Sequence, residues 1–385
     1  MVAFLQSTTS VPLVLDTFLR RTTSWTWVLP VVCFMVALIF QSNVLAVGQG
    51  DFAIVIVLNS ISIGLVLVTV FAALHHAEAI AHRVGQPYGT LVLTFAVTTI
   101  EVSIIVSMML HGSNNPTLAR ESVFSTVMIV CCGIVGIALT VGGWRHNRQD
   151  IRRQGTSAFL SVLVALTVLT MVLPNYTLST APGTFSSIQL VFVGVLSILL
   201  YGSFIFAQSY GQKEDFSEVR ALEEVQGEHL AIAYSLLTHL VLLLLGLGGI
   251  VLLTEQVAAG VEDGLSYLEI TQSDAIVGAG IALVTLMPEA ISAIKASFKN
   301  ELQRGLNVAL GSACATIGLT IPAVVAASLI TGRPLTLGLN AGDTILLLLA
   351  LAMGVVSFGT GRTTLLTGLA HLVIFVAYVL LIVAP

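Results

Sequence analysis

The sequence reads AVTTIEVS at residues 96–103 and VTLMPEAIS at residues 284–292. Each stretch lies inside a long apolar run and carries one carboxylate, Glu101 in the first and Glu289 in the second. A charged side chain at the centre of a bilayer costs about 2.5 to 3.5 kcal/mol on insertion scales, so such residues usually have a functional role. The pair predicts a membrane protein with a binding site or a path for cations.

The composition places the whole chain in the membrane class. Of its 385 residues, 56% are hydrophobic and 9% are charged, and the mean hydropathy is +0.99. Because a helical span needs about 20 residues, we predict an all-α polytopic membrane protein with eleven transmembrane helices. The predicted spans are residues 27–47, 52–74, 88–110, 122–143, 156–174, 185–208, 230–254, 275–297, 305–331, 344–359 and 363–382.

The 15 Lys and Arg residues predict the orientation of these spans. With the N-terminus in the cytoplasm, all of them except Arg120 and Arg333 fall in cytoplasmic connections, as the positive-inside rule requires. The first apolar run is long for a signal peptide and lacks a convincing cleavage site, so we expect it to be retained as a span. The expected environment is a membrane, with lipid around a multi-pass bundle.

A single strongly polar stretch divides the chain. We predict an N-terminal tail and lead helix at residues 1–51, a five-helix repeat at 52–208, an acidic cytoplasmic linker at 209–229 and a second five-helix repeat at 230–385. An odd number of helices reverses the direction of the chain, so the two repeats are expected to be inverted, as in many secondary transporters. Glu101 and Glu289 then occupy the second helix of each repeat.

Hydroxyl and small side chains accompany the two glutamates. Thr98 and Thr285 lie about one helical turn before Glu101 and Glu289, so each shares a face with its carboxylate. Pro288 is expected to disturb the turn before it and free backbone carbonyls that can bind a cation. The helix that follows each glutamate carries a small or hydroxylated patch, Ser125-Thr126 in the first repeat and Gly311-Ser312 in the second.

A histidine-rich segment lies between the two glutamates in the sequence. His75, Glu78 and His82 share one face of a predicted helix. They are compatible with a cytoplasmic vestibule that attracts cations or relays protons, with a polar helix end at the membrane interface, or with a zinc site. The spacing is not the H-E-x-x-H pattern of metalloproteases.

Several stretches resemble a known family. Residues 78–101 and 274–320, including GQPYGTL at 85–91 and LNVALGS at 306–312, resemble the cation/proton exchanger branch of the Ca²⁺/cation antiporter superfamily. Residues 127–143 and 361–385 are similar to bacterial Ca²⁺/H⁺ antiporters that also handle Na⁺ and K⁺. The resemblance implies an eleven-helix fold in which Glu101 and Glu289 bind cations and protons alternately. It also implies a location in a bacterial inner membrane.

The sequence departs from that family at one point. In the eukaryotic members, each glutamate follows a Gly-Asn pair whose carbonyls join the coordination, whereas Val97-Thr98 and Thr285-Leu286 stand at those positions here. The resemblance therefore implies fewer oxygen ligands than the roughly six to eight that Ca²⁺ takes, unless backbone carbonyls and water complete the shell.

The function expected from these features is exchange of cytoplasmic Ca²⁺, and also Na⁺ or K⁺, for external H⁺. A Na⁺(K⁺)/H⁺ antiporter with incidental Ca²⁺ binding is the alternative, and an intramembrane zinc hydrolase built on His75, Glu78 and His82 is a weaker one. No cofactor and no nucleic-acid partner are expected, because the chain has no P-loop pattern and no basic face. The oligomeric state is left open.

Overall fold

The computed structural model describes residues 25–42, 52–84, 88–111, 116–208, 236–267 and 273–384. Within these ranges, nine helices are long and apolar enough to cross a membrane, and two shorter apolar helices are found at Trp25–Gln41 and Thr94–Val106. Each of the eleven predicted spans falls on one of these helices, so the chain is an all-α polytopic membrane protein. The acidic linker at 209–229 lies outside the described residues.

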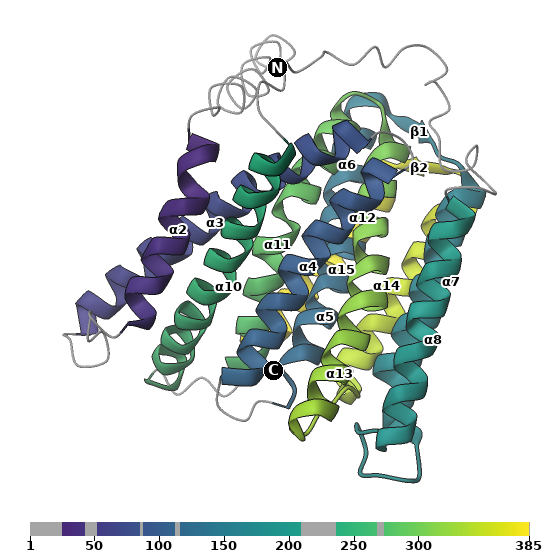
Figure 1. Ribbon diagram of the computed structural model, residues 1–385. Helices are drawn as coiled ribbons and strands as arrows, with labels where there is room; N and C mark the ends of the chain where they lie inside the picture. Colours follow the sequence, from purple (N-terminus) through teal and green to yellow (C-terminus); the bar gives the residue numbers. More distant parts are fainter. Residues whose placement is uncertain are drawn as a thin grey trace. The chain divides into compact units, whose positions relative to one another are not determined.

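Helices make up most of the described residues (Figure 1). Two short strands, β1 and β2, pair antiparallel, with Gln149 opposite Thr363. In chain order the elements are α2 (Trp25–Gln41), α3 (Phe52–Val84), α4 (Tyr88–His111), α5 (Leu118–Met128), η2 (Ile129–Ile134), α6 (Val135–His146), β1 (Arg148–Asp150), α7 (Arg153–Thr167), η3 (Val168–Val172), η4 (Leu173–Tyr176), α8 (Ser187–Phe206), α10 (Leu236–Tyr267), α11 (Ser273–Phe298), α12 (Leu302–Ala315), η6 (Thr316–Thr320), α13 (Ile321–Thr331), α14 (Ala341–Gly359), β2 (Arg362–Thr364) and α15 (Leu365–Val383).

The chain forms two compact units. Unit 1 comprises residues 1–93 and 232–257, and unit 2 comprises residues 94–231 and 258–385. In unit 1, α2 packs along α3, and Gly249 of α10 lies so close to α2 that an added Cβ would be 2.7 Å from the backbone nitrogen of Phe34. These units combine segments from both predicted repeats, and the inverted relation of the repeats stays a prediction.

Unit 2 is built around the continuous span of α5, η2 and α6. Of its most apolar stretch, 89% is buried, more than in any other span found in the described residues, so this span lies at the centre of the unit. Glycines on α6 allow α15 to approach closely, since a Cβ on Gly136 would lie 2.9 Å from the Leu372 side chain. On another side, α11 packs along α5.

Among the described residues of unit 2, π-helical turns η2, η3 and η6 lie within membrane spans. Two of these turns, η2 and η6, lie in the helix that follows each glutamate helix, at similar distances along the chain from Glu101 and Glu289. Single π-turns in α-helices are often found at functional sites. His371 of α15 supports η2, because its Nδ1 lies 2.7 Å from the carbonyl oxygen of Cys131 and therefore donates to it.

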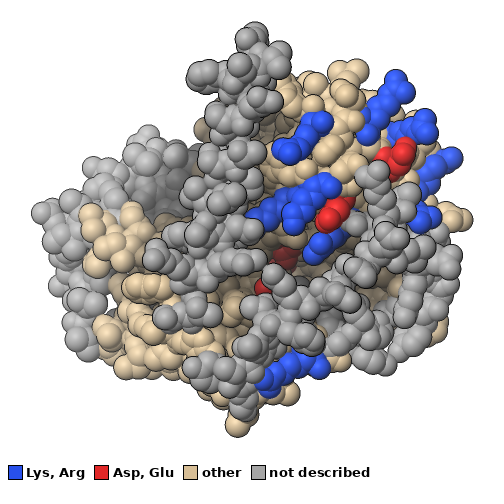
Figure 2. All heavy atoms as spheres, turned by 90° about the horizontal axis from the view of Figure 1, so that it is seen from above, with Lys and Arg blue, Asp and Glu red and all other residues tan. Residues whose placement is uncertain are grey.

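Basic side chains gather at one end of unit 2, which Figure 2 shows from above. Strands β1 and β2 lie at this basic end, where Arg362 pairs with Asp150 at 2.9 Å. Arg120 and Arg333, by contrast, are at the opposite helix ends, beside the start of α5 and the end of α13. The residues of the basic end are Arg145, Arg148, Arg152, Arg153, Lys295, Lys299, Arg304 and Arg362.

Candidate functional site

Glu101 is buried in unit 2 and both of its carboxyl oxygens are hydrogen-bonded. The residue is only 2% exposed. The Thr126 hydroxyl of α5 donates to Oε1 at 3.2 Å, and the Thr316 hydroxyl of η6 donates to Oε2 at 2.5 Å. Hydrogen bonds to an ionised group are the stronger class of hydrogen bond. Two converging hydroxyls therefore make this position suitable for a charged carboxylate despite its burial.

The two threonines come from helices that follow the two glutamate helices. Thr126 lies just before η2, and Thr316 is the first residue of η6. A π-turn holds one residue more than an α-turn, so it changes the direction of the side chains on either side of it. Glu101 thus accepts one hydrogen bond from a hydroxyl group in each half of the sequence. The bond from Thr316 joins residues 215 positions apart.

Glu289 lies on α11 in the same unit, in different surroundings. It is 9% exposed, and its Oε2 has no hydrogen-bond partner among the described residues. Its carboxyl group is close enough to that of Glu101 for their charges to interact. A buried polar atom without a partner is costly and usually indicates a bound ion, a proton or a water molecule. Because both carboxyl groups are shielded from water, they are suited to holding either protons or a cation.

Two further buried hydroxyls lie near the Glu101 contacts in sequence. Ser122 is one turn before Thr126 on α5, and Thr320 closes the turn that Thr316 begins. Both are fully buried, and neither hydroxyl oxygen has a hydrogen-bond partner among the residues that the structure describes. Since α5 and α12–η6–α13 run in opposite directions, both hydroxyls lie on the side of Glu101 away from the basic end.

The other residues predicted from the sequence are placed close to these groups but with different roles. Thr98 is buried and Val97 half-buried on α4. Thr285 is buried, and its hydroxyl donates to the Ile281 carbonyl at 3.1 Å rather than to Glu289. Helix α11 continues from Ser273 to Phe298 through Pro288, so the expected interruption of the helix is absent.

The small patch predicted on the following helix includes the actual contact in the first half and lies one turn from it in the second. Within the patch Ser125-Thr126, the hydroxyl of Thr126 bonds to Glu101, whereas Ser125, predicted as a supporting residue, bonds to Tyr378. Ser312 was predicted in the second half, but Thr316, four residues later on the same helix face, makes the bond. The sequence signal was therefore a hydroxyl at helical spacing from the predicted serine.

The histidine segment belongs to unit 1, where His76 makes the principal contacts. Its Nε2 lies 3.0 Å from the Thr26 carbonyl oxygen and its Nδ1 lies 3.0 Å from His239 Nδ1. Because a carbonyl only accepts, Nε2 donates, and a neutral His76 then accepts at Nδ1 from His239. This buried pair joins α2, α3 and α10, and sequence analysis did not identify His239.

The predicted face of the histidine segment is more open than His76. His75 is half-buried and Glu78 is exposed, while the His82 side chain lies outside the described residues. In the described parts of the chain, no three His, Cys, Asp or Glu side chains converge as a metal site would require. All four cysteines are buried and free.

Comparisons with known proteins agree with this architecture. The sequence profile of the sodium/calcium exchanger protein family matches residues 52–210 and 238–384. The chain is 40% identical to the putative ionic transporter y4hA of Sinorhizobium fredii, over 94% of this chain and 96% of that protein. It is 33% identical to the sodium-potassium/proton antiporter ChaA of Escherichia coli, over 86% of this chain and 90% of ChaA.

Solved structures with the same fold include two proton-coupled exchangers. The H⁺/Ca²⁺ exchanger CAX superposes with a TM-score of 0.64 at 14% identity, covering 91% of this chain and 87% of CAX. Native YfkE superposes with a TM-score of 0.59 at 15% identity, covering 94% of this chain and 100% of YfkE. At such low identity these likenesses establish the fold alone.

Proposed function

Because the chain belongs to the sodium/calcium exchanger family, we propose that it is a cation/proton antiporter in which cations and protons compete for Glu101 and Glu289. The chain is a secondary transporter and not an enzyme, and its ions are transported substrates rather than cofactors. The observation that carries the proposal is the pair of buried carboxyl groups in unit 2, one of which has an oxygen without a partner among the described residues.

Competition for these carboxyl groups couples the two fluxes. Removal from water favours the neutral, protonated carboxyl, whereas a bound cation favours the ionised form. A site occupied by a metal ion therefore releases protons, and a protonated site releases the metal ion. If the site opens to one side of the membrane at a time, the gradient of one ion drives the other without ATP.

Ca²⁺ is the first candidate for the transported cation. Two carboxylates supply a charge of −2, which matches a divalent ion, and oxygen atoms are the ligands that Ca²⁺ prefers. Backbone carbonyls, water and the unpartnered hydroxyls of Ser122 and Thr320 are available to complete the shell.

Na⁺ or K⁺ is the second candidate, and two observations favour it. The Escherichia coli relative is described as a sodium-potassium/proton antiporter. In addition, the groups that bond to Glu101 are threonine hydroxyls and not amide oxygens. A neutral hydroxyl is a weak ligand, and a site with few strong ligands suits a monovalent ion better than Ca²⁺.

We assign the basic end of unit 2 to the cytoplasm, in agreement with the positive-inside rule. The N-terminus then also lies in the cytoplasm, and the protein exports cations from the cell as protons enter across the inner membrane. His75, Glu78 and His82, at the end of α3, are proposed to line a cytoplasmic vestibule.

The proposal is tested by cation-driven proton flux in everted membrane vesicles, read with a pH-sensitive dye. Ca²⁺, Na⁺ and K⁺ are added one at a time to vesicles carrying the wild type, Glu101→Gln or Glu289→Gln. Each substitution removes a charge and a proton-binding group with little change of shape, so each is expected to reduce the flux to that of vesicles without the protein.

Glu301→Gln is the matched control. Glu301 forms an exposed ion pair with Arg304 at 3.3 Å at the basic end, and exposed pairs contribute only about 0–1 kcal/mol. The flux of the Glu301→Gln variant should equal that of the wild type. The comparison requires that the wild type and the three variants are inserted in equal amounts. Wild-type flux from either Glu101→Gln or Glu289→Gln would remove that glutamate from the mechanism.

A further inference from the structure

Unit 2 contains a polar cavity of about 390 Å³ at the end opposite the basic end. Its walls are formed by the beginnings of α5, α11 and α14 and by the last turns of α15. Three carboxylates line it, those of Glu121, Asp274 and Asp343. We call this space the outer cavity.

Each carboxylate of the outer cavity has a partner within the protein. Arg120 forms an ion pair with Glu121, the Thr117 hydroxyl donates to Asp274 at 2.5 Å, and the Asn340 amide donates to Asp343 at 2.6 Å. The Thr117–Asp274 bond joins the wall of α5 to that of α11, whereas the other two contacts each lie within one wall. The outer cavity is therefore a polar space whose carboxylates are engaged by neighbouring side chains, which suits a vestibule better than a closed binding site.

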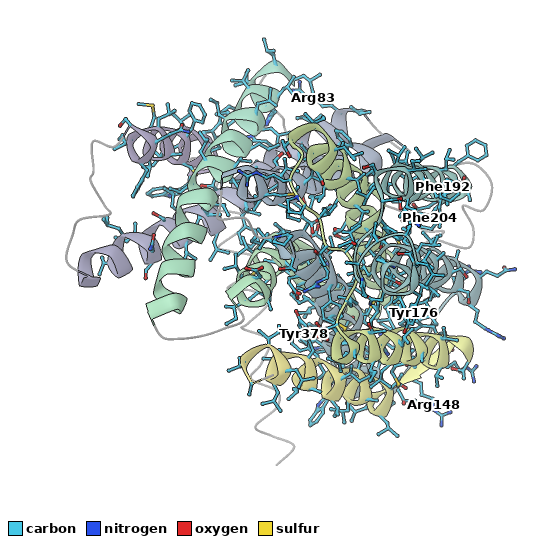
Figure 3. All side chains as sticks on the ribbon, turned by 90° about the horizontal axis from the view of Figure 1, so that it is seen from below. Arg83, Arg148, Tyr176, Phe192, Phe204 and Tyr378 are labelled. Carbon is cyan, nitrogen blue, oxygen red and sulfur yellow. The ribbon has the colours of Figure 1, made fainter. Side chains whose placement is uncertain are left out.

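The inner wall of the outer cavity includes a hydrogen-bonded pair from α15 and α5. Tyr378, on the yellow C-terminal helix in Figure 3, donates its hydroxyl to the Ser125 hydroxyl at 2.7 Å. Its ring also meets the ring of Phe124 edge-on, with centroids 5.6 Å apart. All three side chains line the cavity, and Tyr378 is 2% exposed.

This wall adjoins the glutamate site. Thr126, which donates to Glu101, follows Ser125 directly in α5. Glu101 itself does not line the cavity and is 2% exposed. The Tyr378–Ser125 bond and the Thr126–Glu101 bond thus attach to consecutive residues of α5, one in the wall of the cavity and one at the buried carboxyl group.

We propose that the outer cavity is the vestibule through which cations and protons reach Glu101 from this side, and that the Tyr378–Ser125 hydrogen bond holds its inner wall closed. This inference rests on the proposed function of Glu101. Opening requires that Tyr378 release Ser125, which frees the face of α5 next to Thr126. Tyr378 is accordingly a positioning residue, which controls access to the site and does not bind the transported ion.

The test measures the access of water-soluble reagents to Glu101. Purified protein in liposomes is treated with a water-soluble carbodiimide and an amine, and the modification of each carboxyl group is followed by peptide mass spectrometry. Tyr378→Phe keeps the ring and removes the hydroxyl, and Ser125→Ala removes the other side of the same bond. Both variants should raise the rate at Glu101 about fivefold relative to Asp343, the population change that one lost neutral hydrogen bond produces.

Tyr176→Phe is the control, because Tyr176 is an exposed tyrosine that does not line the outer cavity. It should leave the ratio of Glu101 to Asp343 modification at the wild-type value. A phenol with a purely structural role would lower stability without changing this ratio.

An unchanged ratio in both Tyr378→Phe and Ser125→Ala overturns the inference, whatever the outcome for Glu101→Gln in the transport assay. Conversely, wild-type transport by Glu101→Gln removes the proposed function even if access to Glu101 increases. The two failures are therefore distinguishable.

Discussion

Glu101 and Glu289 are the same residue type in two different environments. Glu101 accepts two hydrogen bonds from hydroxyl groups, whereas Glu289 has an oxygen without a partner among the described residues. At Glu101 the two hydroxyl donors stabilise the ionised form, whereas burial opposes it. The two carboxyl groups are therefore not interchangeable, and we expect their variants to differ in cation affinity.

The bond from Thr316 to Glu101 gives a prediction at this scale. Thr316→Val keeps the volume of the side chain but removes the donor, so the ionised form of Glu101 loses about 1 kcal/mol or more of stabilisation. Protons then compete more effectively, and the cation concentration for half-maximal flux should rise about fivefold or more at a fixed pH. The measurement is the vesicle assay over a range of cation concentrations.

Thr170→Val is the control for that variant. Thr170 is buried in the same unit, but its hydroxyl donates to the Leu166 carbonyl of its own helix at 2.7 Å. Its half-maximal concentration should stay at the wild-type value. Equal shifts in the two variants would show that the Thr316 hydroxyl has no special relation to Glu101.

The sequence was sufficient to identify the glutamates but not their partners. A carboxylate in an apolar run is visible because its burial must be compensated. The bond between Thr316 and Glu101 depends on how distant helices pack, and the bond between His76 and His239 does as well. No local pattern carries that information. Periodicity came within one turn of Thr316, through Ser312, and no further.

At the scale of elements, the spacing of helices around the site depends on small residues. Gly278 of α11 lies against the backbone of α5, where an added Cβ would be 2.8 Å from the nitrogen of Ser122. Gly280 follows two residues later, and a Cβ added there would have no neighbouring atom within 4 Å. The first glycine thus sets the distance between the helix of Glu289 and the helix of Thr126, and the second does not.

This difference predicts opposite outcomes for two conservative changes in one helix. Gly278→Ala forces α11 away from α5, with a cost of about 1–3 kcal/mol that is typical of overpacking. It should lower the thermal stability of the detergent-solubilised protein and reduce transport. Gly280→Ala should be close to neutral in both measurements, and a loss in Gly280→Ala equal to that in Gly278→Ala would contradict this account.

Helix positions were predictable from hydropathy, whereas some helix ends and the π-turns were not. The second span was predicted to end at residue 74, and α3 continues to Val84 through the histidine segment, which was also predicted to be helical. The alanines of that segment favour helix beyond the apolar run. The first span was predicted at 27–47, but α2 ends at Gln41. Turn η2 arises within an apolar sequence and η6 lies between two threonines, and the two turns share no sequence pattern that would have predicted them.

At the scale of the whole molecule, the distribution of charge defines two ends. The basic end of unit 2 carries eight of its described Lys and Arg residues, namely those named above, while Arg120 and Arg333 lie at the other end. The outer cavity opens at that second end. We therefore expect cytoplasmic reagents to reach the basic end and external reagents to reach the cavity.

Cysteine labelling tests this orientation, because the four natural cysteines are buried. Lys299→Cys at the basic end and Ser179→Cys at the opposite end both place a thiol at an exposed position. In everted vesicles, a membrane-impermeant maleimide should label Lys299→Cys at once and Ser179→Cys only after permeabilisation. The reverse pattern would place the basic end outside the cell.

The unpartnered oxygen of Glu289 has a consequence for how tightly the two ion fluxes are coupled. If Glu289 belongs to the transport site as proposed, the empty site buries a carboxylate oxygen that has neither water nor, among the described residues, a hydrogen-bond donor. The empty site therefore has a high free energy. Reorientation across the bilayer then requires a load in both directions. Reorientation of the empty site would let ions leak down their gradient without exchange. The Glu289 oxygen that attracts the ion or proton also suppresses this leak.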